Sequence, residues 1–249
     1  MNLFHVFKTF TKFILIVSIA CIFSDCESEL NAEKIIQKSI KFHGGLINWK
    51  NISSISYIKQ ITLLDSKGNL EQEISQKITH GWNPTFTEME WKKPEGNYRA
   101  FNDHSGIKLF KNNEILKNSV LLKQTKKNLD GALYVFWQPY KLLDKKAKLE
   151  YFGEESLLDS ISVHKIKVSY IASNDDAIWY YYFDTIDFRL IATRVDHKER
   201  KSLILNETVE SITGLYLNET RKSYFLDSLE KISYLRAVYT YEIKRLIKN

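Results

Sequence analysis

Ile55-Ser56-Tyr57-Ile58-Lys59-Gln60-Ile61-Thr62-Leu63-Leu64, then Asp65-Ser66-Lys67-Gly68-Asn69, then a β-rich run from Leu70 to Thr79, is the stretch that decides the fold. Both flanking runs carry the β-formers and the period of two that are typical of strands with one buried face. The polar, glycine-containing segment between them is typical of a turn. The sequence therefore predicts an antiparallel β-hairpin.

Further β-rich segments follow this hairpin along most of the chain. Strands are predicted at 86–91, 98–101 and 107–110, and later at 149–152, 160–171, 177–184, 188–196, 203–211, 214–224 and 233–243. No connection between them is long enough for the crossover helix that parallel strands need. The apolar alternation changes phase between Val163 and Ile166, which predicts a β-bulge near His164-Lys165. We therefore expect an α+β, mainly β fold, in which one large antiparallel sheet curls into a half-open barrel.

Two helical regions interrupt the β pattern. Ala32, Ile35, Ile36, Ser39, Ile40 and His43 recur at helical spacing, which predicts a helix over 32–43 that ends at Gly44-Gly45. In the middle of the chain, helices are predicted at 119–129 and 132–137, separated by Gly131, and Pro139 ends the second near Gln138. The segment 133–137 is apolar all round, which indicates burial on several sides. We expect it to be a plug or lid over the concave face of the sheet.

The N-terminal residues indicate export. Lys8 and Lys12 precede an apolar run from Phe13 to Ala20, which is too short to span a bilayer and ends at Cys21. A small residue before a cysteine is typical of a bacterial lipoprotein signal. This predicts a signal peptide over 1–20, lipidation of Cys21, a tether over 21–30 and a single domain over 31–249. Cys26 is an alternative lipidation site, and an ordinary secretory signal with incidental cysteines is a further interpretation.

Composition and charge exclude some classes of function. With 44% hydrophobic and 27% charged residues, the chain has the composition of a globular protein and not of a disordered one. The net charge of +6 is spread along the sequence, which indicates a solvated surface and not a nucleic-acid-binding patch. We expect no nucleic-acid partner, and attraction to anionic lipid head groups is a better use of the charge.

Motifs for catalysis or metal binding are missing from the sequence. It contains no His-Glu-x-x-His, no cysteine pair at zinc spacing, no glycine-rich phosphate loop and no Gly-x-Ser-x-Gly. We therefore expect no metal and no cofactor. Glu88 and Glu90 share one face of a predicted strand, where they are either an acid/base pair in a cavity or, as we prefer, part of a solvated outer face.

Several longer motifs carry a family resemblance. The chain resembles an uncharacterised family of Gram-negative lipoproteins in three places. These are Glu33-Lys34-Ile35-Ile36 with His43-Gly44-Gly45, the stretch from Tyr134 to Asp144, and Trp179-Tyr180-Tyr181-Tyr182-Phe183-Asp184. That family is similar in architecture to the LolA/LppX-like superfamily. The resemblance covers about residues 31 to 243 and implies a half-open antiparallel barrel whose apolar cavity holds acyl chains or lipidated partners. It implies no catalytic residues, and a lipid anchor departs from LolA itself, which is a soluble carrier.

The candidate ligand site is a set of aromatic and basic side chains. The expected cavity lining consists of Trp91, Phe136, Trp137, Tyr140, Trp179 and Tyr182, although each alone also suits an ordinary core. Arg221 and Arg236 are candidates for holding a phosphate or carboxylate at the barrel rim, with surface salt bridging as the alternative.

Three functions follow from these expectations. The leading one is a lipid-anchored protein of the cell envelope, in the outer membrane facing the periplasm, that binds a lipid or acyl chain in the concave cavity. The second is an interaction lipoprotein without a ligand, which docks onto an envelope protein partner. The third is an enzyme acting on a lipid or sugar, and its only basis is Glu88, Glu90 and the scattered histidines.

Overall fold

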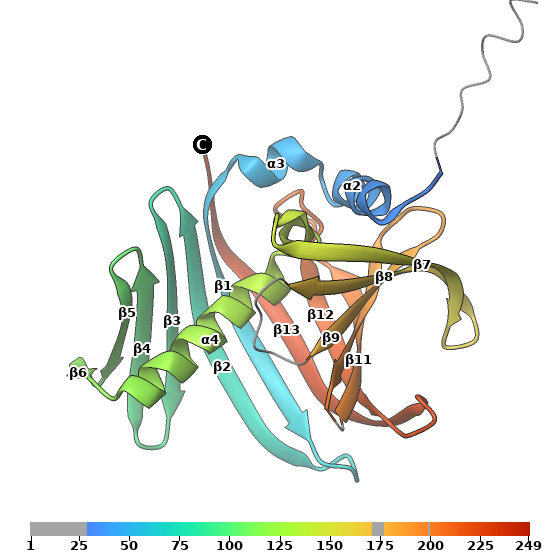
Figure 1. The fold of residues 1–249 in the computed structure, drawn as a ribbon. Coiled ribbons are helices and arrows are strands. Elements are labelled where there is room, and N and C mark those ends of the chain that lie inside the picture. Colours follow the sequence, from blue (N-terminus) through green and yellow to red (C-terminus); the bar gives the residue numbers. More distant parts are fainter. Residues whose placement is uncertain (1–28, 171–176, 199) are drawn as a thin grey trace, which may run out of the picture. The chain divides into compact units, whose positions relative to one another are not determined.

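Thirteen strands, each antiparallel to its neighbours, form one curved sheet that does not close (Figure 1). They belong to a computed structural model of the chain, which describes residues 29–170, 177–198 and 200–249. The predicted signal peptide, Cys21 and Cys26 lie outside the described residues. The expected antiparallel, mainly β fold is confirmed.

The strands lie at or near the predicted ranges, and several of them, such as β1, β2, β7 and β13, extend beyond those ranges. They are β1 (Ile52–Leu64), β2 (Leu70–Trp82), β3 (Thr85–Lys93), β4 (Gly96–Asp103), β5 (Gly106–Lys111), β6 (Glu114–Leu116), β7 (Ala147–Leu157), β8 (Ile161–Tyr170), β9 (Ile178–Asp184), β10 (Leu190–His197), β11 (Arg200–Val209), β12 (Asn218–Leu226) and β13 (Ile232–Lys248). Their order across the sheet is β6-β5-β4-β3-β2-β1-β13-β12-β11-β10-β9-β8-β7. The first strand therefore pairs with the last in the middle of the sheet, and β6 and β7 form its edges.

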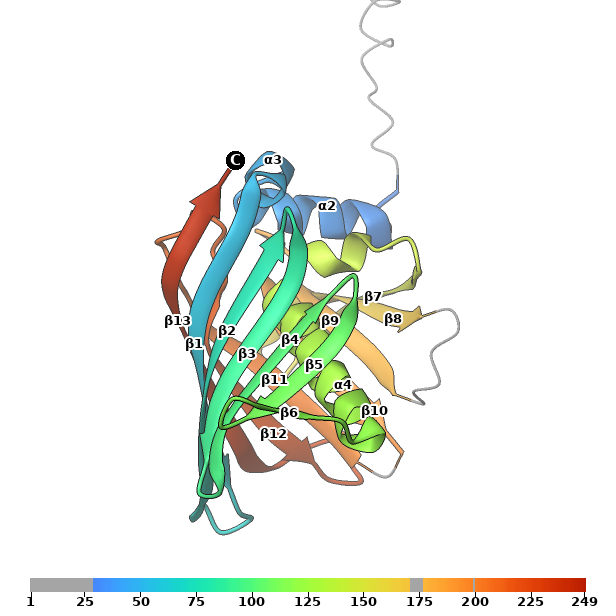
Figure 2. The same ribbon diagram turned by 90° about the vertical axis from the view of Figure 1, so that its left-hand side faces the viewer.

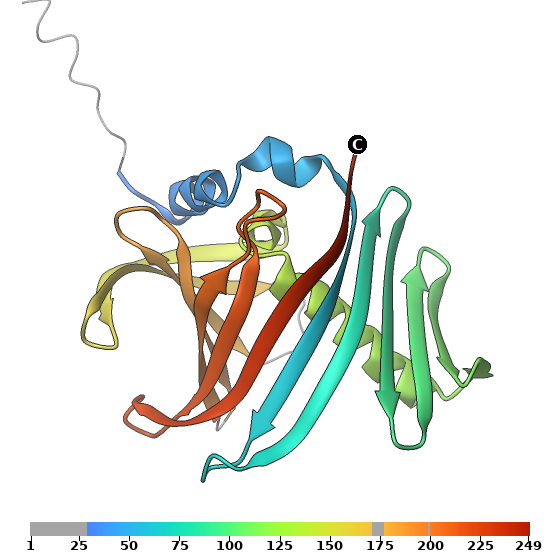
Figure 3. The same cartoon turned by 180° about the vertical axis from the view of Figure 1, so that it is seen from behind.

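Alternation along the strands gives the sheet two faces. Tyr57 on β1 and Tyr241 on β13 point to the concave side, where both contact Phe136 of the central helix. Lys59 of β1 is the cross-strand partner of Tyr241 and lies on the same side. The cross-strand pairs of β13 with β12, β12 with β11, β11 with β10 and β10 with β9 place Tyr181 of β9 on this side as well. Figure 2 shows the central helix α4 within the curve of the sheet, and Figure 3 shows the outer face of the strands with α4 behind them.

Four helical segments accompany the sheet in the described part of the chain. They are α2 (Ala32–Phe42), α3 (Leu46–Lys50), α4 (Ser119–Phe136) and the short 3-10 helix η2 (Tyr140–Leu143). The helix α2 buries Ala32, Ile35, Ile36, Ser39 and Ile40, which is the predicted apolar face. Sequence patterns did not indicate α3 or the three-residue strand β6.

The predicted break at Gly131 is wrong, because α4 runs without interruption from Ser119 to Phe136. A glycine inside a helix is destabilising by about 1 kcal/mol relative to alanine, which tertiary packing readily offsets. Leu129 and Phe136 on either side of Gly131 are both buried. The Asn118 side chain also caps the helix by accepting a hydrogen bond of 2.9 Å from the Leu121 amide.

The predicted bulge at His164-Lys165 is also wrong in its position. The pairing of β8 with β9 is continuous from Val163 to Val168, and the extra residue lies on the neighbouring strand β7, between Tyr151 and Glu154. The phase of burial changes along β8 because both faces of the sheet are covered there. Val163 packs in an apolar cluster on the outer face, whereas Ile166 is buried on the concave face.

The C-terminal end of α2 is fixed by buried polar contacts. The His43 ring bridges two segments distant in sequence, since Nδ1 lies 2.9 Å from the carbonyl oxygen of Tyr216 and Nε2 accepts from the Leu190 amide at 3.4 Å. Gly44 follows with a φ of +87°, and an added Cβ there would lie 2.1 Å from the carbonyl oxygen of Gly214. The His-Gly-Gly sequence therefore ties the end of α2 to the start of β10 and to the β11–β12 connection.

Candidate functional site

The C-terminal end of α4 closes part of the concave side with stacked aromatic rings. Phe136 stacks on Tyr57 with ring centroids 3.8 Å apart, and Trp137 stacks on Trp82 at 4.3 Å. Trp49 of α3 meets Trp137 edge-on at 4.7 Å, and it stacks on Tyr140 at 5.5 Å. Three of the predicted lining residues, Phe136, Trp137 and Tyr140, therefore come together as a plug that fills this end of the concave side.

An open groove lies between α4 and strands β8 and β9. Its volume is about 570 Å³, within the range of small-molecule sites. The residues that give it an apolar wall are Leu133, Tyr134, Val135, Tyr170 and Trp179. Charged side chains on α4 and after it, including Lys127, Asp130, Lys141 and Asp144, line it as well. We call this the Trp179 groove.

Hydroxyl groups form a network beside this groove. The Tyr170 hydroxyl donates to that of Tyr134 at 2.8 Å, and the Tyr134 and Tyr181 hydroxyls are 2.6 Å apart. Gln138 Nε2 donates to the Tyr181 hydroxyl at 2.8 Å. Burial raises the pKa of all three tyrosines well above the ordinary value, so the network stays protonated and neutral. Its contribution is to fix α4 against the sheet and to give the groove a polar side.

A second groove lies on the other side of α4. It has a volume of about 360 Å³ and is lined by residues of α4, β2 and β3, among them Ile74, Met89, Trp91, Leu121 and Leu129. We call it the Trp91 groove. The two predicted lining residues Trp91 and Trp179 therefore lie in different grooves, on opposite flanks of one helix.

The concave floor beyond α4 carries many apolar side chains that are only half-buried, with polar side chains such as Lys59 among them. The apolar side chains concerned are Ile61, Leu63, Ile74, Val195, Ile204, Phe225 and Tyr239, on β1, β2 and β10–β13. Val195 is the cross-strand partner of Trp179, so this floor continues from the Trp179 groove. An ordinary domain core would bury these residues fully.

Other predicted residues lie on the outer face. Tyr182 points away from α4 and is buried in a cluster with Val163, Ala192 and Leu203, so the structure does not bring it together with the other lining residues. Glu88 and Glu90 also point outward. Glu88 forms an ion pair with Arg99, and Glu90 Oε1 lies 3.4 Å from Lys77 Nζ. The structure therefore places these glutamates on a solvated outer face.

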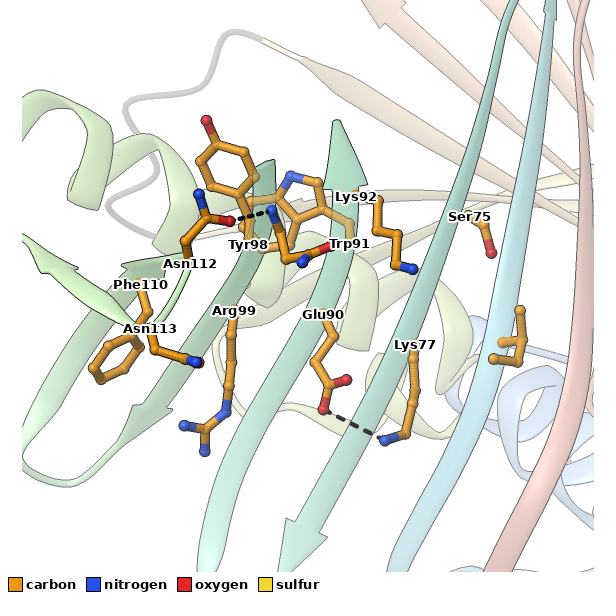
Figure 4. Close-up of a pocket in the computed structure, with 12 residues that line it drawn as sticks. Ser75, Lys77, Glu90, Trp91, Lys92, Tyr98, Arg99, Phe110, Asn112 and Asn113 are labelled. Carbon is orange, nitrogen blue, oxygen red and sulfur yellow. Dashed lines mark hydrogen bonds and ion pairs between the residues drawn. The ribbon is translucent and has the colours of Figure 1, made fainter. Parts of the chain in front are cut away.

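A pocket of about 470 Å³ lies over this row of charges (Figure 4). Lys77, Glu90, Arg99 and Phe110 face it from consecutive strands, and Asn112 borders it, where its side chain accepts from the Asn97 amide at 2.9 Å. Its main charges pair with one another. This pocket therefore offers less for a ligand to bind than the grooves beside α4.

The two predicted arginines differ in their surroundings. Arg236 contacts the Leu64 carbonyl and the Glu71 carboxylate, and so ties β13 to the β1–β2 hairpin. Arg221 is buried on the concave face of β12, where Nε donates to Asn206 Oδ1 at 2.9 Å. Only Arg221 of the two therefore faces the side on which α4 lies.

Sequence patterns did not identify Gly131, or the tyrosines that border the Trp179 groove, as residues of a binding site. Read as a single helix, the segment 119–136 presents Lys127, Gly131 and Tyr134 on one flank and Leu121, Thr125 and Leu129 on the other, which is how α4 lines two grooves. Among the described residues, no group of three or more His, Cys, Asp or Glu side chains is placed to hold a metal ion. No helix in the described part of the chain is long and apolar enough to cross a membrane.

Comparisons with known proteins rest on structure. No protein-family model matches the chain, and no curated protein matches it in sequence. A LolA superfamily protein from Nitrosomonas europaea superposes with a TM-score of 0.54 at 10% identity, covering 89% of this chain and 94% of that one. A DUF1329 family protein from Desulfovibrio piger gives a TM-score of 0.48 at 8% identity, covering 88% and 93%. The lipoprotein LppX from Mycobacterium tuberculosis gives 0.30 at 11% identity, covering 86% and 95%. The first of these shows that the domain has the LolA-like fold implied by the sequence resemblance.

Proposed function

We propose that this protein binds a lipid or other acyl-chain ligand on the concave side of its sheet, along α4. The observation that carries the proposal is the set of half-buried apolar side chains on the concave floor of β1, β2 and β10–β13, which continues into the Trp179 groove. A folded domain gains little from leaving so many apolar side chains half-covered on an inner face, whereas a ligand chain would complete their burial.

Burial alone supplies enough free energy to retain such a ligand. Each methylene removed from water contributes about 0.8 kcal/mol, so a sixteen-carbon chain contributes roughly 10 kcal/mol before ordering costs are subtracted. The Trp179 groove and the Trp91 groove lie on the two flanks of α4, and we place the ligand chain in the Trp179 groove, which is the larger of these two. The LolA-like fold supports this class of ligand.

The proposal includes attachment to the cell envelope. The sequence before residue 31 predicts a lipoprotein signal with lipidation at Cys21 or Cys26, and we propose that the mature protein is anchored in the outer membrane and faces the periplasm. Mass analysis of the mature N-terminus tests this part. A lipidated chain that begins at Cys21 or Cys26 agrees with it, and an unmodified N-terminus contradicts it.

A second candidate function is docking to an envelope protein partner without any ligand. The observation in its favour is the aromatic plug of Phe136, Trp137 and Tyr140, which already fills one end of the concave side. It differs from the leading proposal in requiring no contribution from the open grooves. Changes inside the Trp179 groove therefore distinguish the two.

Gly131 offers such a change. It lines the Trp179 groove, and a Cβ added to it meets nothing within 4 Å. Gly131→Leu would occupy space for three or four ligand methylenes and should weaken binding of a fluorescent fatty acid such as cis-parinaric acid about 100-fold. Gly131→Ala is the matched control, because it adds one carbon and raises helix propensity by about 1 kcal/mol. Equal affinities of the two variants would contradict binding in this groove.

A further inference from the structure

Arg221 is a buried cation with few partners. Its side chain is on the concave face of β12, opposite Tyr239 of β13 and Asn206 of β11, and the residue is only 4% exposed. Nε donates to Asn206 Oδ1 at 2.9 Å, and Asn206 Nδ2 in turn donates to the carbonyl oxygen of Leu190 at 2.8 Å. The orientation of the guanidinium is therefore fixed from one side.

No described residue supplies an anion to the other side of this guanidinium. Arg221 forms no ion pair with any carboxylate in the described part of the chain, and its terminal N–H groups have no hydrogen-bond partner there. Arg194 and Arg236, by contrast, each pair with at least one carboxylate. Burying a cation without a counter-charge is unfavourable by several kcal/mol, so such a group calls for a partner that is supplied from outside.

Polar and apolar neighbours on the same face suit an amphiphilic ligand. Burial raises the pKa of Tyr181 and of Tyr239, and the nearby Arg221 charge opposes the rise in both. The buried Thr193 hydroxyl, across the strands from Tyr181, has no hydrogen-bond partner among the described residues. Ile204 and Tyr239 beside Arg221 are half-buried floor residues, so apolar surface lies next to the charge.

We infer that Arg221 binds the anionic head group, a carboxylate or phosphate, of an amphiphile whose chain lies over the apolar concave floor. Because Nε is engaged by Asn206, the two terminal nitrogens remain for the two oxygens of such a group, in the bidentate geometry that arginine favours. This inference rests on the proposed function and narrows its ligand from any apolar chain to an anionic one.

The test compares a charged probe with its neutral analogue. Binding of cis-parinaric acid and of its methyl ester is titrated by fluorescence with the full folded domain, at a pH where the free acid is ionised. A charge-assisted hydrogen bond predicts that the wild-type protein binds the acid about 10- to 100-fold more tightly than the ester. Arg221→Met should abolish this preference and leave binding of the ester unchanged, and Arg221→Lys should restore part of it.

Lys222→Met is the matched control. It removes the same charge from the next residue of β12, on the outer face, where Lys222 pairs with Glu207 at 3.1 Å. It should preserve the preference for the acid. Displacement of the bound acid by oleate, by a monoacyl phosphate and by a neutral monoacylglycerol then distinguishes the sources of the anion. Both anions should displace it, the stronger one identifies the head group, and the neutral lipid should be weaker than either.

Failure of this inference differs from failure of the proposed function. Equal affinity of the wild-type protein for acid and ester would overturn the role of Arg221 alone. An equal loss of both probes in Arg221→Met, together with a lower free energy of unfolding, would show that the arginine is structural and would also overturn it. If neither probe binds to the wild-type protein, the proposed function falls and the inference falls with it.

Discussion

The buried ring of His43 makes folding stability depend on pH. Burial lowers its pKa from an ordinary value of 6.5 to about 4, and hydrogen bonding to the backbone at Tyr216 opposes this shift. The ring is held as the neutral form with a proton on Nδ1, which donates to Tyr216, while Nε2 accepts from Leu190. A proton added to Nε2 would replace this acceptor with a donor that faces another donor.

The sign and size of the effect follow from linkage. Between the two pKa values the unfolded chain binds a proton that the folded protein does not, so the free energy of unfolding falls as the pH falls from about 6.5 to about 4. Once the pH is below both pKa values, the His43 shift has lowered the free energy of unfolding by about 3 kcal/mol. Between about pH 7.5 and about pH 5 the loss is about 2 kcal/mol. His80, whose pKa burial lowers to about 3, adds a contribution in the same direction.

The measurement is therefore a difference between variants. Urea unfolding at about pH 7.5 and about pH 5 gives the pH-dependent loss for the wild-type protein and for His43→Asn, whose side-chain amide can still donate to Tyr216. We expect the variant to lose about 2 kcal/mol less than the wild-type protein over this interval. His104→Asn, in the turn between β4 and β5, serves as the control and should behave as the wild type. An equal loss in His43→Asn and wild type would refute this account of His43.

Further expectations concern packing. Gly44→Ala should be destabilising by several kcal/mol, because its Cβ would lie 2.1 Å from the carbonyl oxygen of Gly214. Gly45→Ala is the control: it has a similar φ and no neighbour within 4 Å, so the free energy of unfolding should fall by only about 1 kcal/mol. Equal losses of stability in thermal unfolding would contradict this expectation. Phe136→Ala should be destabilising by about 3–5 kcal/mol through loss of the contact with Tyr57, against less than about 1 kcal/mol for the exposed Phe152→Ala, as chemical denaturation can check.

Regular alternation made the sheet predictable. The hairpin of β1 and β2 and the helix α2 each bury one face, so the sequence period of two or of 3.6 identified them directly. The wide antiparallel sheet followed from the number of strands and the short connections. The pairing of β1 with β13, which places the first and the last strand in the middle of the sheet, depends on contacts that no local pattern encodes.

The site was harder to predict than the fold. The run from Trp179 to Phe183 is aromatic on both faces of β9, so its sequence cannot show that Tyr181 points to the concave side and Tyr182 to the outer side. Gly131 suggested a break because its propensity is low, whereas packing at Leu129 and Phe136 keeps the helix whole. The burial of Arg221 depends on the curvature of the sheet, which the alternation of a single strand does not reveal.

Binding of a lipid chain to the concave side can be observed on the protein as it leaves the cell. The most direct measurement is native mass spectrometry of the protein purified from its own membrane, followed by extraction and identification of bound lipid. We expect an acyl lipid to co-purify with the wild-type protein and with Gly131→Ala, and to be lost in Gly131→Leu. A wild-type protein that carries no lipid and takes up no fluorescent fatty acid would contradict it.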